Sequence, residues 1–362
     1  MICNSCVLDS SIKSLTFTEG KCNFCLEYNP LLERKKKEND LSNQLDNIFT
    51  KISKIKKKYN CLIGVSGGVD SSYIVHLAKS YDVRPLLLHF DNGWNSELAV
   101  SNIKKISDKC NFELQTYVVN WQEFKNLQRS FIKSGVIDIE LVTDHAIFAN
   151  LINTAKKNKI KYILSGTNIF TEHAMPKEWI WRKSDIRNIK SIHKKYGSVK
   201  IKTYPTMNFF DWYISKYLNF GPKLIEPLNM INYKKTYAVE ILKSNYGWTE
   251  YEDKHFESFF TKFYQAYILK KKFNVDKRKS HLSCLIRNKE ITRDDALKIL
   301  EKDEYPGDFE RDKNYFCKKL DFSEEEFDEI LRTKPVSHLD FDNSEKIFKF
   351  SKKIYQFFYN SK

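Results

Sequence analysis

The sequence predicts an α/β protein: a doubly wound parallel sheet with a small cysteine-rich module before it and a helical region after it. Short apolar runs alternate with helical segments between residues 60 and 165. Four cysteines fall within the first 25 residues, and helical periodicity dominates beyond residue 235. A chain of 362 residues suits one α/β domain with additions at both ends.

The amino-terminal module carries its cysteines as two pairs with two residues between partners. The pairs are Cys3 with Cys6 and Cys22 with Cys25. This spacing is typical of a zinc ribbon, in which each pair lies on a tight knuckle and four thiolates surround Zn²⁺. A redox dithiol is the alternative, although it needs only one pair. Four sulfurs leave no open position, so we expect a structural zinc ribbon over residues 1–30.

Residues 31–58 form a basic connector with one apolar stripe. Its apolar side chains recur at spacings of three and four, as expected for one face of a helix. They are Leu41, Leu45, Ile48, Ile52 and Ile55. We expect this helix to pack against the following domain more than to bind a partner.

The α/β domain is expected over residues 59–235. Its expected strands span residues 61–65, 85–90, 112–119 and 160–164. Helical segments lie between them, and Asp144 is expected to cap one. Strands that alternate with helices indicate a parallel sheet covered by helices on both faces.

Two later stretches differ in composition. From Trp179 to Phe220 the chain is irregular and aromatic, which fits either core packing or a platform for a sugar or partner. Residues 236–362 are expected to form a helical region that binds substrate or a partner protein. Within it, Ser323 and Glu326 have the spacing of a capping box.

A polar, glycine-rich loop follows the first strand of the α/β domain. It reads Ser66-Gly67-Gly68-Val69-Asp70-Ser71. The glycines let the backbone turn tightly and direct N–H groups at phosphate oxygens, while the helix start adds positive charge. The two serines can donate hydroxyl hydrogens, and Asp70 suits either a Mg²⁺ ion or the helix start. The Gly-Lys-Ser/Thr ending of a Walker loop is absent.

This loop resembles that of the PP-loop ATP pyrophosphatases, whose motif is Ser-Gly-Gly-x-Asp-Ser. The resemblance implies a Rossmann-like fold of the HUP type, cleavage of ATP between its α and β phosphates, and adenylylation of a substrate oxygen. It also implies that Asp70 is a Mg²⁺ ligand. The residues that it assigns to ATP in this segment are Val65, Ser66, Gly67, Gly68, Asp70 and Ser71.

Two further loops fit the same resemblance, because both follow expected parallel strands at their carboxyl ends. The residues expected to contact the nucleotide there are Asp91, Asn92, Gly166, Thr167 and Asn168. Glu172, which follows the second loop, is expected to be a second Mg²⁺ ligand. Each segment alone would be a weak signal, since Gly-Thr-Asn also suits a simple turn.

The flanking segments resemble the N-acetyl sugar amidotransferases of bacterial surface-polysaccharide and flagellar-sugar pathways. The similarity runs from Met1 to about Tyr305 and includes the cysteine pairs, the loop and the stretch 254–283. It implies that an acetamido carbonyl oxygen, on a free or nucleotide-linked sugar, takes AMP from ATP. Ammonia then displaces AMP to give an acetamidine, and pyrophosphate is also released.

The resemblance also implies a separate glutaminase partner, because nothing in this chain resembles a glutaminase and Cys3 is assigned to the zinc site. Four side chains suit stabilisation of pyrophosphate and of the charged intermediate. They are Lys254, Lys277, Arg278 and His281. With Asp70 and Glu172 they form the expected catalytic set, although a basic helical face is the alternative for the four.

The formal net charge of +15 favours phosphate-bearing partners such as nucleotides, nucleotide sugars or RNA. It therefore also fits a tRNA-modifying PP-loop enzyme, either a thiolase or a lysidine-type ligase. Sulfur-transfer relatives place further cysteine pairs near the loop, whereas the other cysteines here are scattered. They are Cys61, Cys110, Cys284 and Cys317. A non-catalytic nucleotide-binding scaffold is disfavoured, because the loop retains its polar groups.

The start of the chain does not resemble a signal peptide, and no apolar run approaches the roughly 20 residues that cross a bilayer. We therefore expect a cytoplasmic protein with reduced thiols and no membrane partner.

Overall fold

The computed structural model describes residues 1–37, 41–208, 221–251, 256–302 and 304–351. At its centre is a five-stranded parallel sheet with the order β5-β4-β3-β6-β7. The strands are β3 (Cys61–Val65), β4 (Pro85–Asp91), β5 (Glu113–Val118), β6 (Tyr162–Leu164) and β7 (Lys223–Ile225).

The strand order has a switch point at the centre of the sheet. Along the chain, β3 is the first strand of this sheet. Strands β4 and β5 are then added on one side of β3, and β6 and β7 on the other. In register, Ile63 of β3 pairs with Leu87 of β4 and with Leu164 of β6. In open sheets of this kind, ligands bind beside the carboxyl ends of the strands where the order reverses.

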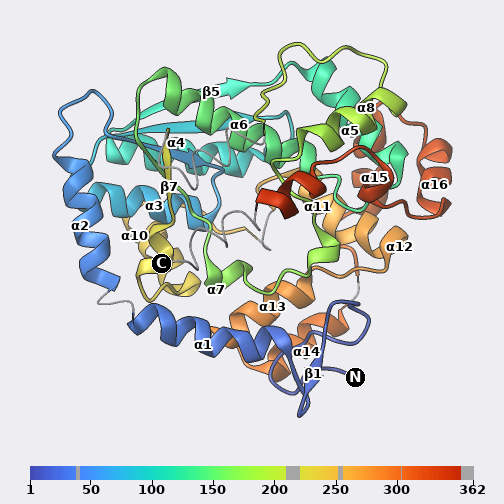
Figure 1. Ribbon diagram of the computed structural model, residues 1–362, viewed down its shortest axis with the longest axis horizontal. Coiled ribbons are helices and arrows are strands. Elements are labelled where there is room, and N and C mark those ends of the chain that lie inside the picture. Colours follow the sequence, from blue (N-terminus) through green and yellow to red (C-terminus); the bar gives the residue numbers. More distant parts are fainter. Residues whose placement is uncertain (38–40, 209–220, 252–255, 303, 352–362) are drawn as a thin grey trace.

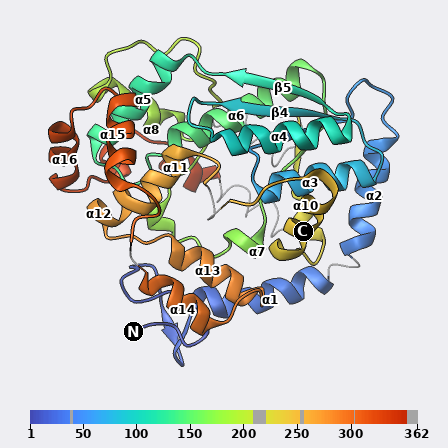
Figure 2. The same ribbon diagram turned by 180° about the vertical axis from the view of Figure 1, so that it is seen from behind.

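Helices cover both faces of the sheet, as expected from the alternating pattern (Figures 1 and 2). On one face lie α2 (Leu41–Ser53), α3 (Val69–Ser80), α4 (Glu97–Cys110) and α10 (Lys235–Tyr246). Their apolar side chains share a buried cluster with Cys61, Ile63 and Val65 of β3. The neighbouring strand residues point the other way, since Leu62, Leu86 and Leu88 pack with α6.

The opposite face is covered by α6 (Leu141–Lys157), with α5 (Trp121–Ser134) and α8 (Ile186–Tyr196) beyond it. The prediction that Asp144 caps a helix is wrong. Helix α6 begins at Leu141, with Glu140 at the cap position, and the Asp144 carboxylate lies 2.8 Å from Lys183 Nζ. The stretch predicted to be irregular from Trp179 contains α8, whose start is capped by the Asp185 side chain.

The aromatic side chains of that stretch are packed where the structure describes them. Trp179 is buried, and the Trp181 ring stacks on His338 with centroids 5.0 Å apart. Tyr204 is also buried, whereas Phe209, Phe210, Trp212 and Tyr213 of the same stretch lie outside the described residues. Core packing therefore accounts for the two tryptophans at its start.

The cysteine-rich module is a hairpin of β1 (Phe17–Thr18) and β2 (Lys21–Cys22), followed by α1 (Asn23–Lys37). Helix α2 then packs on the sheet domain, with Leu45, Phe49 and Ile52 buried. Leu45 and Ile52 of the expected apolar stripe are thus packed as predicted, whereas residues 31–37 belong to α1.

The carboxyl-terminal region is helical as expected, and its helices face the carboxyl ends of the strands (Figure 1). Ser323 caps α16, since its Oγ accepts a hydrogen bond from the Glu326 N–H at 3.1 Å. The remaining elements are α7 (Ile169–Glu172), η1 (Lys177–Trp179), η2 (Pro227–Met230), α11 (Phe259–Phe263), η3 (Tyr264–Ile268), α12 (Leu269–Phe273), α13 (Arg278–Arg287), α14 (Arg293–Glu301), α15 (Phe309–Lys319), α16 (Glu324–Arg332) and η4 (His338–Asp340).

One buried cluster joins side chains from the cysteine-rich module, from α5 and α6, and from the carboxyl-terminal helices. The boundaries expected near residues 30, 58 and 235 remain predictions, because apolar contacts cross them. Within the described parts of the chain, none of the helices combines the length and the apolar character needed to cross a bilayer.

Candidate active site

A cavity of about 790 Å³ lies between the carboxyl ends of the strands and the carboxyl-terminal helices. It is lined from both sides by residues that the sequence pointed to. These are Val65, Ser66, Gly68, Asp70, Ser71, Asn92, Gly166, Thr167, Glu172, Lys277, Arg278 and His281. Gly67, Asp91 and Asn168 lie behind this lining, and Lys254 lies outside the described residues. Segments more than 200 residues apart in the chain thus meet at one cavity.

The glycine-rich loop depends on a left-handed backbone at Gly67, whose φ is +85°. A Cβ there would lie 2.7 Å from the carbonyl oxygen of Ala99, so only glycine fits. The Gly67 carbonyl accepts hydrogen bonds from Trp248 Nε1 and from the Tyr251 hydroxyl, both at 3.0 Å. The loop is therefore fastened to the segment after α10.

The hydroxyls of the loop hold its shape. Ser71 Oγ donates to the Gly68 carbonyl at 3.2 Å, and Ser66 Oγ accepts from the Gly68 N–H at 3.3 Å. Gly68 occupies the cap position of α3 and has no side chain to offer the helix start. The first N–H groups of α3 are therefore left for an anion in the cavity.

The loop after β6 packs directly on the start of α3. A Cβ at Gly166 would lie 2.9 Å from the carbonyl carbon of Asp70 and from the Ser71 nitrogen. Asn168 is buried and caps α7, accepting from the Thr171 N–H at 2.9 Å and donating to the Gly166 carbonyl at 3.1 Å. Asn168 thus shapes the loop from behind instead of facing the cavity.

Asp70 is held by two hydroxyls. Tyr233 donates a short hydrogen bond to Asp70 Oδ1, and Thr171 Oγ1 donates to Oδ2 at 3.3 Å. Burial, together with the Asp70 carboxylate, raises the pKa of Tyr233 well above its usual value, so the phenol stays a donor. Asp70 and Glu172 both line the cavity, and their carboxylates are ligands that suit Mg²⁺.

At the end of β4, Asp91 organises the turn. Its Oδ1 accepts hydrogen bonds from the Gly93 N–H at 2.9 Å and from Asn95 Nδ2 at 3.3 Å. Asn95 Nδ2 also lies 3.2 Å from His89 Nε2, while His89 Nδ1 lies 3.1 Å from the Val65 carbonyl oxygen. His89, Asn92 and Asn95 all line the cavity, although His89 and Asn95 were not among the expected site residues.

A wall of paired charges lies on the α6 side of the cavity. Lys183 Nζ is 2.7 Å from Asp138 Oδ2 and 2.8 Å from Asp144 Oδ2. Lys277 Nζ is 3.2 Å from Glu140 Oε2. Burial opposes ionisation of Asp138, but the charges of Lys183 and Lys277 hold its pKa below the usual value. The signal available in the sequence was three carboxylates within the mostly apolar stretch 136–149.

Among the expected catalytic cations, Lys277 and Arg278 both have carboxylate partners. Arg278 Nη2 lies 2.7 Å from Asp276 Oδ2, and Arg278 Nη1 donates to the Lys302 carbonyl at 2.6 Å. Arg278 therefore also ties α13 to the end of α14.

The carboxyl-terminal region also contacts the glycine-rich loop. Glu257 Oε1 lies 3.1 Å from the position that a Cβ at Gly68 would take. The backbone around Glu257 is fixed, since the Ser96 N–H donates to the Glu257 carbonyl at 2.9 Å. Glu257 falls within the stretch that carried the sequence resemblance, but it was not among the expected site residues.

The four amino-terminal cysteines form one cluster, with all four sulfurs within 4.8 Å of one another. Sγ of Cys3 is 3.9 Å from that of Cys25, and Sγ of Cys6 is 3.6 Å from that of Cys22. Zn–S bonds of about 2.3 Å in a tetrahedron place sulfurs about 3.8 Å apart, so the cluster fits a zinc ion. The thiols interact strongly: hydrogen bonds from Cys22 and Cys25 lower the pKa of the Cys6 thiol, whereas the pKa values of Cys22 and Cys25 are raised.

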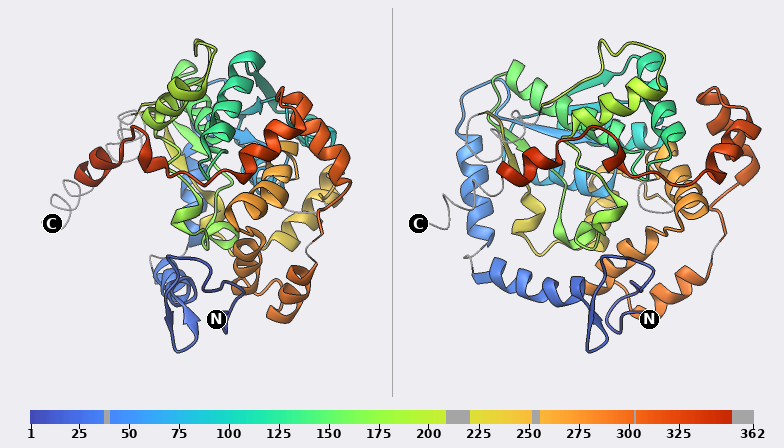
Figure 3. Two further views of the ribbon diagram at one scale, coloured as in Figure 1. Left: turned by 90° about the vertical axis from the view of Figure 1, so that its right-hand side faces the viewer. Right: turned by 45° about the vertical axis from the view of Figure 1, so that its right-hand side comes forward.

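The cysteine-rich module lies beside α13 and α14 (Figure 3). Arg293 Nε, at the start of α14, donates to the carbonyls of Cys3 and Cys6, both at 3.1 Å. The Val7 N–H donates to Ser283 Oγ at 3.3 Å, and Lys279 Nζ lies 2.5 Å from Asp9 Oδ2. Helix α13, which carries Arg278 and His281, thus rests on the cysteine-rich module.

The carboxyl-terminal part of the chain has a recognisable relative. Residues 257–355 match the family model described as "LPS biosynthesis protein WbpG-like, C-terminal domain". The match includes residues 257–283, which carried part of the expected resemblance, and it continues past Tyr305, where that resemblance was expected to end. An uncharacterized protein of Methanocaldococcus jannaschii, MJ1599, is 26% identical over 184 residues, which cover 49% of this chain and 63% of that protein. The match thus spans less than two thirds of the relative's length.

Two solved structures are similar in part. The NMN synthetase from Francisella tularensis matches with a TM-score of 0.30 and 17% identity, over 36% of this chain and 54% of that one. An NH3-dependent NAD synthetase from Campylobacter jejuni matches with a TM-score of 0.35 and 12% identity, over 74% of this chain and 97% of that one. At such TM-scores neither likeness carries an argument about the function of this chain.

Proposed function

We propose that the protein is an ATP-dependent amidotransferase that converts the N-acetyl group of a bacterial sugar into an acetamidino group. The observation that carries the proposal is one cavity lined both by the loop 66–71 and by residues of the WbpG-like region. In this proposal the loop 66–71 binds the phosphates of ATP, and the WbpG-like region acts on the same reactants. The products are the acetamidino sugar, AMP and pyrophosphate.

In this proposal the loop and the start of α3 bind the phosphates of ATP. Their N–H groups and the hydroxyls of Ser66 and Ser71 are donors for the pyrophosphate that leaves. Asp70 and Glu172 would hold Mg²⁺, which supplies positive charge beside the phosphate oxygens. The hydrogen bonds from Tyr233 and Thr171 orient the Asp70 carboxylate for that role.

The chemistry needs adenylylation because an amide oxygen is a poor leaving group. The acetamido carbonyl oxygen attacks the α-phosphorus, and the bond to the β-phosphate breaks with its electron pair leaving on pyrophosphate. Ammonia then attacks the activated carbon and gives up a proton, and the C–O bond breaks as AMP departs. The carbon ends as an amidine.

The lining of the cavity supports an acetamido sugar as the acceptor. Ile147, Met175 and Ile180 give apolar surface that suits the acetyl methyl group, and the paired charges of Glu140 and Lys277 line the same cavity. A separate glutaminase partner, which supplies ammonia, is part of the proposal.

The test uses the purified protein with ATP, Mg²⁺ and an ammonium salt, and a panel of free, UDP-linked and CMP-linked acetamido sugars. We expect one sugar to stimulate release of AMP and pyrophosphate, and mass spectrometry to show the exchange of oxygen for an NH group. ADP as the main product would contradict the mechanism.

The tRNA-modifying alternative draws on the net charge of +15. Binding to RNA by general charge weakens steeply with salt, so the acceptors are best compared at roughly 0.2 M salt. If bulk tRNA stimulates pyrophosphate release there and no acetamido sugar does, the alternative replaces our proposal.

A further inference from the structure

Twelve of the 61 Lys and Arg residues of the chain gather at the amino-terminal edge of the sheet. The segments 54–60, 79–84, 108–113 and 156–161, with Lys223, contain twelve Lys or Arg and three Asp or Glu. Their formal net charge is +9, of the +15 carried by the whole chain. We name this set of segments the edge patch.

The topology brings these segments together. All five strands are parallel, so the ends at which they begin lie along one edge, and α2, α3, α4 and α6 end there. The turns contact one another: Lys57 Nζ donates to the Lys159 carbonyl at 2.8 Å, and Arg84 Nη2 donates to the Ile55 carbonyl at 2.9 Å. The Lys223 N–H donates to the Lys161 carbonyl at 2.7 Å.

The edge patch lies opposite the cavity. The strands point from the edge patch toward the carboxyl-terminal helices, as the arrow of β5 shows (Figures 1 and 2). The cavity itself has no basic excess. Its acidic lining residues are Asp70, Glu140, Asp144, Glu172, Glu250, Glu257 and Glu304, and its basic ones are Lys183, Lys235, Lys270, Lys277 and Arg278. The surplus positive charge is therefore not located where nucleotide or sugar phosphates would bind.

The type of basic residue in the edge patch indicates which class of partner it binds. Eleven of its twelve basic residues are lysines, which act as point charges, whereas phosphate and nucleic-acid recognition favours the planar arginine fork. Three aromatic rings lie among the lysines. Lys58 Nζ is 4.7 Å from the Tyr59 ring centroid, Lys161 Nζ is 5.6 Å from that of Tyr162, and Lys79 Nζ is 5.9 Å from that of Phe112.

We propose that the edge patch docks the protein on the surface of an anionic lipid bilayer. Clustered lysines are attracted to an anionic leaflet, and amphipathic tyrosines suit the headgroup level. A row of loop tips along a sheet edge can meet a plane, and the cavity at the opposite edge stays open to water. The expectation of no membrane partner rested on the lack of a spanning segment, which peripheral docking does not need.

Docking of this kind is reversible and sensitive to salt. Each lysine near an anionic surface strengthens binding about five-fold, and the effect fades beyond a Debye length of about 10 Å at 0.1 M salt. Removal of three lysines should therefore weaken vesicle binding roughly a hundred-fold.

The test is co-sedimentation of the full chain with vesicles. One set contains phosphatidylcholine alone, and the other contains equal parts of phosphatidylcholine and phosphatidylglycerol. The patch variant is Lys56→Gln/Lys157→Gln/Lys161→Gln, at exposed positions of the edge patch. Circular dichroism and thermal unfolding establish that each variant is folded.

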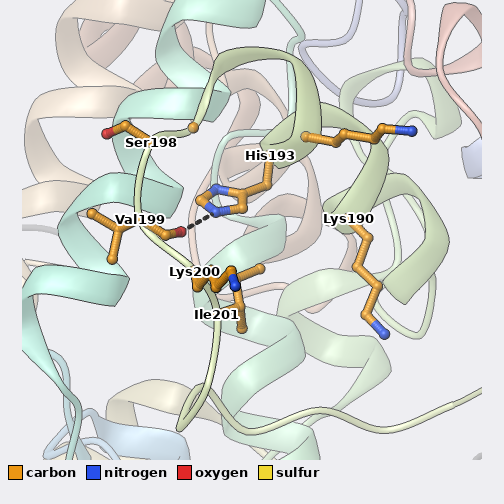
Figure 4. A pocket seen from close by; sticks show the side chains of 8 residues that line it. Lys190, His193, Ser198, Val199, Lys200 and Ile201 are labelled. Carbon is orange, nitrogen blue, oxygen red and sulfur yellow. Dashed lines mark hydrogen bonds between the residues drawn. The ribbon is translucent and has the colours of Figure 1, made fainter.

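A matched control removes three lysines elsewhere. Lys190, Lys194 and Lys200 line an open pocket of about 340 Å³ at the end of α8, where His193 Nε2 lies 2.7 Å from the Val199 carbonyl oxygen (Figure 4). The control variant Lys190→Gln/Lys194→Gln/Lys200→Gln loses the same net charge from a different surface.

We expect the wild type and the control variant to bind the anionic vesicles at low salt, the patch variant to lose that binding, and none to bind phosphatidylcholine. Equal losses in the two variants would mean that net charge alone is responsible, and would overturn the proposal. So would binding of RNA at roughly 0.2 M salt that depends on the edge patch while the vesicles stay unbound.

Discussion

The Cα of Gly166 lies so close to the first turn of α3 that a Cβ on it would come within 2.9 Å of the carbonyl carbon of Asp70. The two loops at the switch point of the sheet are thus fitted to each other through backbone atoms, which cannot rotate away as a side chain can. The position of Asp70 therefore depends on a residue almost a hundred positions later.

Gly166→Ala should push the loop after β6 away from α3. We expect a loss of about 1–3 kcal/mol in unfolding free energy, typical of overpacking, and weaker ATP binding by calorimetry. Gly64→Ala is the control, because its nearest neighbours are the Cδ carbons of Leu151 at 3.2 and 3.3 Å, which can move. ATP affinity equal to that of the wild type in Gly166→Ala would contradict this prediction.

Asp70→Ala should lower pyrophosphate release about 100-fold or more while the fold persists, since a metal at the phosphates contributes several kcal/mol. Tyr233→Phe removes one hydrogen bond to this carboxylate. We expect it to lower the free energy of unfolding by about 1.5–3 kcal/mol and to slow pyrophosphate release less than Asp70→Ala does. Its signature is a raised Mg²⁺ requirement in titrations of activity against Mg²⁺. Tyr237→Phe, on the exposed side of α10, is the control and should behave as the wild type.

Two buried histidines predict acid sensitivity. Burial lowers the pKa of His338 and of His145 to about 4. In the unfolded chain their pKa is about 6.5, so between pH 6.5 and 4 the unfolded state binds more protons. Stability should therefore be fully present above pH 6.5 and fall as the pH is lowered to 4, by up to roughly 3 kcal/mol for each histidine.

The measurement is the thermal unfolding midpoint from pH 8 to pH 4. His338 Nε2 lies 3.3 Å from the Asp138 N–H and Nδ1 lies 2.7 Å from Asn188 Oδ1, an arrangement that requires the neutral ring. His338→Gln should be less stable than the wild type at pH 7, but its unfolding midpoint should change less between pH 6.5 and pH 4. A pH slope as steep as that of the wild type would rule out His338 as a source of the effect.

The cysteine cluster predicts about one zinc per chain. Cys22→Ser should lose the metal and lower the soluble yield, because binding to a structural zinc site is also folding free energy. Arg293→Ala keeps all four thiols but removes the hydrogen bonds to the Cys3 and Cys6 carbonyls. We expect it to retain zinc by elemental analysis and to release it faster to a chromogenic chelator. Iron in place of zinc, or a folded protein without metal, would contradict the assignment.

Four of the five strands of the sheet, the glycine-rich loop and the cysteine cluster could be predicted, because each depends on a local pattern. Strand β7, which is only three residues long, was not among the expected strands. Cys61–Val65 is apolar at every position, as a strand buried on both faces must be, and the loop motif follows at once. The spacing within each cysteine pair is likewise visible in a short stretch of sequence. These features need no knowledge of which distant segments meet.

The charged wall could not be predicted, because its partners are far apart in the chain. Lys183 pairs with Asp138, and Lys277 pairs with Glu140 across more than a hundred residues. Nothing in the local pattern says that α13 faces the start of α6. Asn168 illustrates a different limit, since an asparagine after a strand suits both a nucleotide contact and a helix cap.

The attachment of the cysteine-rich module to α13 and α14 also determines when this module can finish folding during synthesis. The ribosome makes Cys3 and Cys6 before Arg293, Ser283 and Lys279, which bind this module and emerge some 280 residues later. Until then Val7, which is buried against Leu282 and Ala296 in the finished protein, is not covered by them. The cysteine-rich module can therefore be completed only after α13 and α14 have been made, and a truncated chain that ends before α13 should aggregate even when zinc is plentiful.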